Sequence, residues 1–262
     1  MQRSMFIAAT GMDAQSLNID VISNNLANVN TTGFKRSRAD FQELMYQTLQ
    51  DPGATSADGT ILPTGIQLGL GVEPAAVQKI FKQGDFASTD NPLDLVVEGN
   101  GFFQILTPEG EVAYTRAGAF KLDSEGNIVN SNGYAMEPAI TIPANTLNIT
   151  ITTDGTVTAL QAGSTSPVEV GQIELAQFTN PGGLTSIGKN LFLTTESSGE
   201  PTTGAANSEG FGSVNQGFLE LSNVNVVEEM VNMIVSQRAY ELSSKVVQTS
   251  DEMLALANNI KR

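Results

Sequence analysis

The sequence predicts an α+β protein in which long N- and C-terminal α-helices pair as a helical core domain, with a central, mostly antiparallel β domain between them in the chain. Apolar residues recur at helical spacing near both ends, and short β-branched or aromatic runs separated by turn residues fill the middle. The charge divides the chain at similar places. Residues 67–223 carry a net charge of -12, whereas 1–33 and 224–262 carry -1 each.

The first 29 residues predict an amphipathic helix with a coiled-coil-like seam. Seven of eight positions that alternate in steps of three and four are apolar: Met5, Ala8, Met12, Gln15, Ile19, Ile22, Leu26 and Val29. Gly33 and the Asn/Thr cluster before it are expected to end this helix.

The last 39 residues predict a second, longer helix. Its stripe has a mean step of 3.6, which is typical of a nearly straight helix: Val224, Val227, Val231, Ile234, Arg238, Leu242, Val246, Thr249, Met253, Leu256 and Ile260. Asn225 followed by Glu228 resembles a capped start, and no Pro or Gly follows before Arg262.

The middle of the chain predicts short strands joined by tight turns. We expect them at Leu93–Val97, Phe102–Leu106, Ala119–Leu122, Leu147–Thr152, Ile173–Phe178 and Leu191–Thr195. The Gly/Ser/Thr-rich stretch 197–216 is predicted to be loop. We therefore divide the chain into a discontinuous helical core (1–33 and 224–262), a connecting region (34–66 and 204–223) and an outer β domain (67–203).

Composition narrows the classes of function. His, Cys and Trp are absent, which removes the side chains of most Ser-His triads, thiol nucleophiles, zinc sites and haem ligands. Carboxylate pairs, Ser-Lys dyads and bound divalent cations stay open. A net charge of -15 argues against nucleic-acid binding, and no run approaches the roughly 20 apolar residues of a membrane span. We predict no enzyme activity, no cofactor, no metal and no cleaved leader.

Two groups of residues are candidates for contacts between chains. Asn24, Asn25, Asn28 and Asn30 either cap and fray the first helix, or bond across helices and fix their register. Arg238 interrupts the apolar stripe of the second helix. It is either a surface residue or the partner of a carboxylate or carbonyl on a neighbouring chain.

Both ends resemble the signatures of the bacterial flagellar rod and hook proteins. The N-terminal match is Thr10-Gly11-Met12-Asp13-Ala14-Gln15 with Asn24 to Lys35, and the C-terminal match is Ser222 to Asn225, Glu229 to Val231 and Gln237 to Glu241. The turn-and-strand sequence Gly99-Asn100-Gly101-Phe102-Phe103 is similar to a motif of the same family's β domain. The resemblance assigns the self-assembly interface to Asn24, Asn25, Asn28, Thr32, Gly33, Phe34, Asn223, Asn225, Glu229, Met230, Gln237, Arg238 and Tyr240.

One segment is similar to the distal-rod members of that family. It runs from Tyr46 to Pro63 and precedes Gly65-Ile66-Gln67-Leu68-Gly69. The candidate rod-specific residues are Tyr46, Asp51, Pro52, Gly53 and Pro63. A proximal-rod or hook subunit remains the alternative, and the other classes are an enzyme with helical arms and a non-flagellar fibre or adhesin module.

The resemblance implies a structural role. Members of the family assemble into a hollow helical shaft that crosses the periplasm within the basal body and transmits motor torque to the hook. The partners implied are further copies of the chain, proximal-rod proteins, the hook protein, the surrounding ring (bushing) proteins and the flagellar type III export apparatus, which exports subunits without a cleaved signal.

Overall fold

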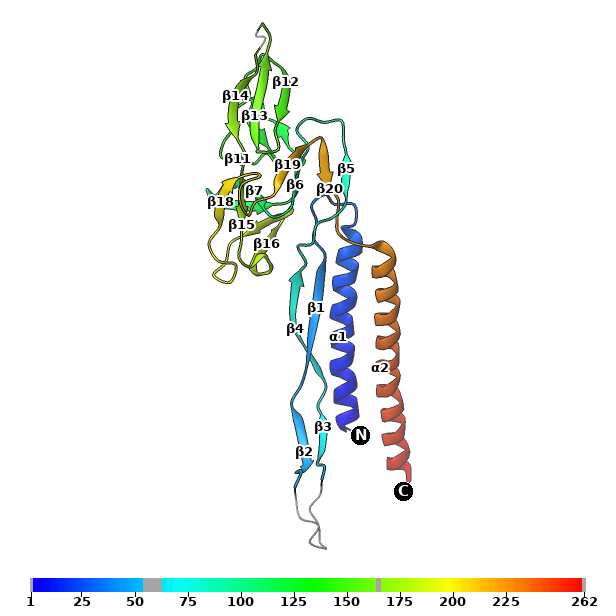
Figure 1. The fold of residues 1–262 in the computed structure, drawn as a ribbon. Helices are drawn as coiled ribbons and strands as arrows, with labels where there is room; N and C mark the ends of the chain where they lie inside the picture. Colours follow the sequence, from blue (N-terminus) through cyan, green and yellow to red (C-terminus); the bar gives the residue numbers. More distant parts are fainter. Residues whose placement is uncertain (1, 54–62, 164–165, 261–262) are drawn as a thin grey trace. The chain divides into compact units, whose positions relative to one another are not determined.

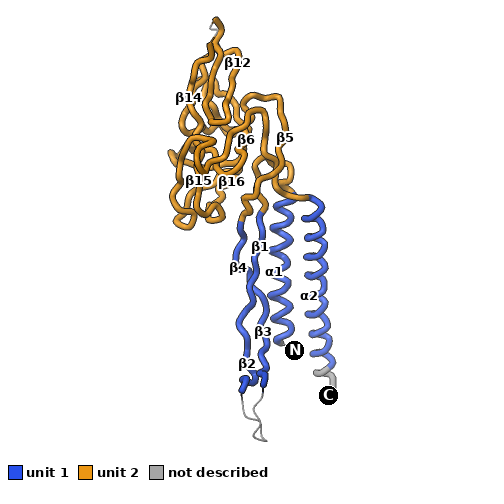
Figure 2. Tube along the Cα trace, viewed as in Figure 1, with its two compact units in different colours: residues 1–26, 37–78, 226–262 blue, residues 27–36, 79–225 orange. Residues whose placement is uncertain are grey.

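The computed structural model describes residues 2–53, 63–163 and 166–260. They form two compact units, each built from separate stretches of the chain (Figure 2). Unit 1 contains 1–26, 37–78 and 226–262, and unit 2 contains 27–36 and 79–225. Residues 37–78, which the sequence analysis divided between a connecting region and the β domain, therefore group with the terminal helices.

Two long helices pair in unit 1, and this part of the predicted fold class is confirmed. They are α1 (Gln2–Ala27) and α2 (Val226–Ile260). They run antiparallel, so that both chain ends lie at the same end of the unit (Figure 1). The helix α1 ends just before the Asn/Thr cluster, where side chains that bond to nearby backbone favour turns. Neither described helix is long and apolar enough to cross a bilayer.

A long two-stranded ribbon completes unit 1 beside α1 (Figure 1). The chain runs out along β1 and β2 and returns along β3 and β4, with pairs β1–β4 and β2–β3. The Val72 amide reaches the Thr10 hydroxyl of α1 at 3.5 Å. The strands are β1 (Ser37–Glu43), β2 (Tyr46–Gln50), β3 (Ile66–Gly69) and β4 (Val72–Lys79).

Unit 2 is an antiparallel β domain, as predicted. Its largest sheet has the order β16-β17-β8-β7-β15-β18, with β11 on β7, and a separate sheet has the order β12-β13-β14. The strands are β5 (Phe86–Ser88), β6 (Leu95–Glu98), β7 (Phe102–Leu106), β8 (Val112–Thr115), β9 (Lys121–Leu122), β10 (Ile128–Val129), β11 (Met136–Glu137), β12 (Thr146–Ile151), β13 (Thr156–Gln161), β14 (Val168–Gln172), β15 (Glu174–Gln177), β16 (Thr185–Gly188), β17 (Leu191–Leu193), β18 (Thr202–Ala205), β19 (Ser213–Gln216) and β20 (Phe218–Glu220). A 3-10 turn, η1 (Pro181–Gly183), precedes β16.

The loop prediction for 197–216 was wrong. Within it, β18 pairs with β15 and β19 pairs with β6. Both strands are only four residues long, and their Gly, Ser and Thr content resembles that of a loop. Pairing with distant strands decides their conformation, which overrides weak local propensity.

The core of unit 2 lies under β6, β7 and β15. Phe103, Ile105 and Leu175 are fully buried, and the Phe103 and Phe120 rings meet edge to face at 5.2 Å. Alternate residues of each strand point into this core, because side chains of a strand alternate between its two faces. The domain thus has its own hydrophobic core, which the terminal helices do not supply.

Candidate assembly interface

The apolar stripe of α2 is exposed in the isolated chain. Val227 is 71% exposed, Leu242 66% and Leu256 63%. Further large apolar side chains lie exposed along the same helix: Met230, Val231, Ile234, Val235, Val246 and Met253. A long row of exposed apolar side chains, interrupted only at Arg238 in the described stripe through Val246, is typical of a protein interface.

The stripe of α1 behaves differently. From Met5 to Leu26, none of the seven stripe positions is exposed, and Ala8 and Ile22 are buried. The sequence predicted an amphipathic helix at each end, and both helices are present. Only α1 has its stripe covered within the described chain.

Asn25 connects three elements of unit 1. Its Oδ1 accepts the backbone N–H of Ser37 at 2.8 Å, and its Nδ2 donates to the Ser37 carbonyl at 2.8 Å. The same Nδ2 donates to Glu229 Oε2 of α2 at 3.4 Å. Asn25 and Glu229 are 1% and 3% exposed, so this network of α1, β1 and α2 is internal to the chain.

The other N-terminal candidates lie near the end of α1 or beyond it. Asn24 is on an exposed face of the helix, while Asn28 Oδ1 is 3.2 Å from the Thr31 hydroxyl that donates to it. The Thr32 carbonyl accepts a hydrogen bond from Asn190 Nδ2 at 2.9 Å. Asn28 and Thr32 therefore serve local contacts in unit 2.

Gly33, Phe34 and Asn223 belong to a group of crossing segments in unit 2, which we call the collar (33–36, 80–84 and 220–223). The backbone N–H of Gly33 donates to the Glu220 carbonyl at 2.8 Å. Gly33 has φ 71°, and a Cβ there would lie 2.6 Å from the Ala117 nitrogen, so both conformation and space require glycine. Phe34 is buried, with the Lys79 ammonium 5.0 Å from its ring centroid.

Asn223 ties the collar segments together. Its Oδ1 accepts the Arg36 N–H at 2.8 Å, and its Nδ2 donates to the carbonyls of Ile80 at 2.8 Å and Lys82 at 2.9 Å. Ile80 N–H in turn donates to the Arg36 carbonyl at 2.9 Å. One amide side chain thereby joins the three segments that lead into and out of unit 2.

Sequence reasoning missed the buried ion cluster at the centre of the collar. Lys35 Nζ lies 2.5 Å from Glu220 Oε1 and donates to the Lys82 carbonyl, while Arg116 Nη1 lies 3.7 Å from Glu220 Oε2. Burial lowers the pKa of Lys35, and the Glu220 carboxylate opposes that shift. Burial likewise lowers the pKa of Arg116. No spacing in the sequence connects these three positions, although Lys35 ends the N-terminal motif.

The C-terminal candidates lie on α2 or just before it, at the surface. Asn225, Met230, Gln237, Arg238 and Tyr240 are all exposed. Arg238 Nη1 lies 3.4 Å from the carboxylate of Glu241 on its own helix, with both side chains mostly exposed. An exposed pair of this kind is worth at most about 1 kcal/mol.

The rod-specific candidates lie on β2 or in the chain between β2 and β3. Tyr46 is half exposed, and its hydroxyl donates to Glu43 Oε2 at 2.5 Å. Asp51, Pro52, Gly53 and Pro63 are exposed, and 54–62 lie outside the described residues. Apolar side chains of β2, β3 and the turn before β2 are also exposed: Met45, Tyr46, Leu49, Ile66 and Leu68.

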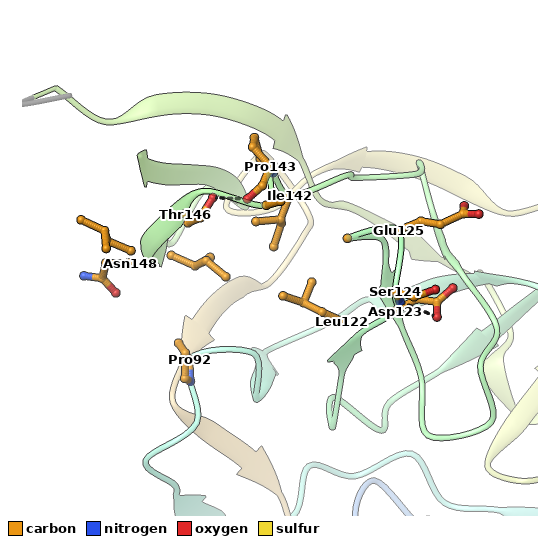
Figure 3. Close-up of a pocket in the computed structure, with 13 residues that line it drawn as sticks. Pro92, Leu122, Asp123, Ser124, Glu125, Ile142, Pro143, Thr146 and Asn148 are labelled. Atoms are coloured by element: carbon orange, nitrogen blue, oxygen red, sulfur yellow. Dashed lines mark hydrogen bonds between the residues drawn. The ribbon is translucent and has the colours of Figure 1, made fainter. Parts of the chain in front are cut away.

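A groove of about 340 Å³ in unit 2 is lined by side chains that include Asp123, Ser124 and Glu125 (Figure 3). Its polar groups bond locally, since the Thr146 hydroxyl donates to the Pro143 carbonyl and the Ser124 N–H donates to Asp123 Oδ1. The described residues contain no cluster of three acidic side chains placed to hold a metal.

Comparison with known proteins agrees with this architecture. Family profiles match residues 5–35 (Flagella basal body rod protein), 96–159 (Flagellar hook protein FlgE/F/G D1 domain) and 215–260 (Flagellar basal body rod FlgEFG protein C-terminal). The chain is 50% identical over 264 residues to the flagellar basal-body rod protein FlgG of Borreliella burgdorferi, with both chains covered fully. The chain belongs to the FlgG family of flagellar basal-body rod proteins. FlgG of Caulobacter vibrioides is 50% identical with 97% of each chain covered, and FlgG of Bacillus subtilis is 40% identical with both fully covered.

Family membership confirms the family predicted from the terminal motifs and the distal-rod function predicted from the segment that begins at Tyr46. The protein is a distal-rod subunit of the flagellar basal body, and its family is structural rather than enzymatic. Full-length similarity to FlgG proteins favours the distal rod over the proximal-rod and hook alternatives. The family implies assembly with other flagellar components.

Proposed function

We propose that this distal-rod subunit polymerises by covering the exposed apolar face of α2 with further copies of the same chain. The observation that carries the proposal is the exposure of Val227, Leu242 and Leu256, which lie along α2 and stay mostly accessible in the single chain. Covering such side chains stabilises association by about 25 cal/mol per Å² of apolar area.

A second copy is the occupant that the chain itself favours. The ribbon of unit 1 also carries exposed apolar side chains, at Met45, Leu49 and Ile66, on an element different from α2. Two unlike apolar surfaces on one subunit favour a heterologous contact, and heterologous contacts that do not close into a ring build an open helical filament. Arg238 and Tyr240 would lie within this contact, and Tyr46, Asp51, Pro52, Gly53 and Pro63 would border it through the ribbon.

The residues whose contacts lie within a single chain have a different role in this proposal. Asn25, Glu229, Gly33, Phe34 and Asn223 hold each unit in the conformation that presents the outer surfaces. The resulting polymer acts as a drive shaft between motor and hook. Its further partners are the proximal-rod proteins, the hook protein, the surrounding ring proteins and the export apparatus.

Leu242→Ser tests the interface. Because Leu242 is 66% exposed in the single chain, the free energy of unfolding should change by no more than about 0.5 kcal/mol. Loss of its burial between copies should cost about 1–2 kcal/mol, which raises the critical concentration for polymerisation roughly 5- to 30-fold.

Leu147→Ser is the matched control, since Leu147 is 71% exposed on β12 of unit 2. It should leave both the stability and the critical concentration unchanged. Sedimentation and electron microscopy of the assembled protein measure the effect. Equal critical concentrations for Leu242→Ser and the wild type would refute the proposed role of α2.

A further inference from the structure

The contacts between α1 and α2 repeat every seven residues along both helices. Moving seven residues forward on α1 moves the contact seven residues back on α2. We call these contacts the polar rungs, and they join Ser4 to Ser250, Gly11 to Ser243, Asn18 to Ser236 and Asn25 to Glu229.

Each rung is small or polar. The hydroxyls of Ser4 and Ser250 lie 3.4 Å apart, and Asn18 Nδ2 donates to Ser236 Oγ at 2.8 Å. A Cβ placed on Gly11 would lie 3.5 Å from Ser243 Oγ, in ordinary contact.

The rungs on α2 are covered although they are polar. Glu229, Ser236 and Ser250 are each no more than 3% exposed, whereas the apolar stripe of the same helix is exposed. A pair of helices held together mainly by apolar burial would show the opposite distribution. The contact between α1 and α2 therefore has a purpose other than burying the most apolar surface available.

We propose that the polar rungs set the axial register of the two terminal helices, and that Glu229 is the residue that selects one register. The rungs act inside one chain, so the inference holds whichever copy covers α2. Polar groups in a helix interface specify register, because a misaligned partner leaves them buried without hydrogen bonds.

Glu229 discriminates between registers because its counterpart is anchored. Both ends of the Asn25 amide bond to the backbone of Ser37, which fixes Asn25 relative to β1. A shift of α2 by one heptad, about 10.5 Å, would move Glu229 opposite Asn18 or past the end of α1. The Ser and Gly rungs would tolerate such a shift, since each would meet another small or polar residue. The Asn25–Glu229 rung would not tolerate either shift: past the end of α1, Glu229 loses its amide donor, and opposite Asn18 it leaves the anchored Asn25 without a partner on α2, which begins at Val226.

Paired cysteines test the register directly, since the chain has no native cysteine. Gly11→Cys with Ser243→Cys joins a rung, and Gly11→Cys with Ser236→Cys samples a register one heptad away. The pairs are closed by mild oxidation or by a short thiol-reactive linker on the full chain, in solution and in the polymer. Gel mobility of the intrachain product measures closure, and circular dichroism shows whether the helices are formed. Wherever the helices are formed, the in-register pair should close at least tenfold faster.

A second in-register pair, Ser4→Cys with Ser250→Cys, provides an independent reading if Gly11→Cys disturbs α1. Comparable closure of in-register and off-register pairs in the helical state would overturn the inference, as would failure of both in-register pairs to close. Glu229→Leu should raise off-register closure several-fold, while Glu229→Gln, which can still accept from Asn25, should change it little. An unchanged ratio in Glu229→Leu would overturn the assignment of Glu229. Polymer yield is measured separately, so failure of the α2 interface is distinguishable from failure of the register.

Discussion

Removing the Lys35 charge should destabilise unit 2 more than most single substitutions. Lys35 and Glu220 are 0% and 1% exposed in their side chains, and the ammonium lies between Glu220 Oε1 and the Lys82 carbonyl. Lys35→Met leaves the Glu220 carboxylate buried with the Gly84 N–H at 2.9 Å and an Arg116 guanidinium 3.7 Å away. Neither the Gly84 N–H nor the more distant Arg116 replaces the ion pair with Lys35, which is the shortest contact of the Glu220 carboxylate.

Breaking a buried ion pair from one side typically costs about 3–5 kcal/mol, and we expect that magnitude for Lys35→Met. Glu220→Gln should cost a similar amount, since it leaves Lys35 and Arg116 as buried cations without a counter-ion. The double variant removes both members of the pair. It should also cost about 3–5 kcal/mol rather than the sum of the two, because residues in one network are not additive.

Urea unfolding of the full chain measures these differences, with hydrogen exchange of the β7 amides as a probe confined to unit 2. Lys121→Met is the matched control, because Lys121 is exposed on β9 and should change the free energy of unfolding by about 0.5 kcal/mol or less. Additive losses in the double variant, or a loss under 1 kcal/mol in Lys35→Met, would refute the reasoning.

Three further predictions concern assembly. Arg238→Ala should leave the melting temperature of the subunit nearly unchanged, because the pair of Arg238 with Glu241 is exposed. It should weaken polymerisation by about 2–5 kcal/mol per contact, since we expect the guanidinium to be buried between copies. Comparable losses of melting temperature and polymer yield would contradict this. Deletion of 46–63 should leave unit 2 folded but alter the straightness or bending stiffness of the polymer, and an unchanged straight polymer would exclude that role. In the free subunit, the amides of 5–29 and 227–260 should exchange faster than those of the β strands and become protected on assembly; strong protection before assembly would mean a preformed helical domain.

Helical periodicity predicted both terminal helices because it depends only on spacing within one segment. What the pattern could not show is which chain covers the apolar side. The stripe of α1 from Met5 to Leu26 is covered within the chain, whereas the stripe of α2 through Leu242 is exposed. An amphipathic pattern indicates that one side of a helix is buried in the assembled protein. It does not indicate which element or chain covers that side, because this depends on tertiary and quaternary contacts.

The short strands and the buried ion cluster could not be predicted from the sequence, because both depend on partners that are distant in the chain. The four residues of β18 gain their conformation from β15, and Lys35 gains its partner from a residue 185 positions later in the chain. Neither signal is local. The sequence predicts part of the amide network, since Asn25 does bond across helices, but its shorter hydrogen bonds go to the backbone of Ser37, in a strand within the predicted connecting region.

The polar side of α2 that contacts α1 and its exposed apolar side differ in the free energy that their contacts contribute. A hydrogen bond such as Asn18 to Ser236 adds only about 0.5–1.5 kcal/mol net, while covering the 66% of Leu242 that is exposed adds about 1–2 kcal/mol, and α2 carries several such side chains. The polar rungs are therefore selective but weak, and covering the apolar side of α2 needs another molecule. Under the proposed assembly, a subunit could leave the cell with its ends poorly held together and gain both its helical order and most of its stability on joining the polymer. The register set by Glu229 would then ensure that each added subunit presents Leu242 and its neighbours at the same height.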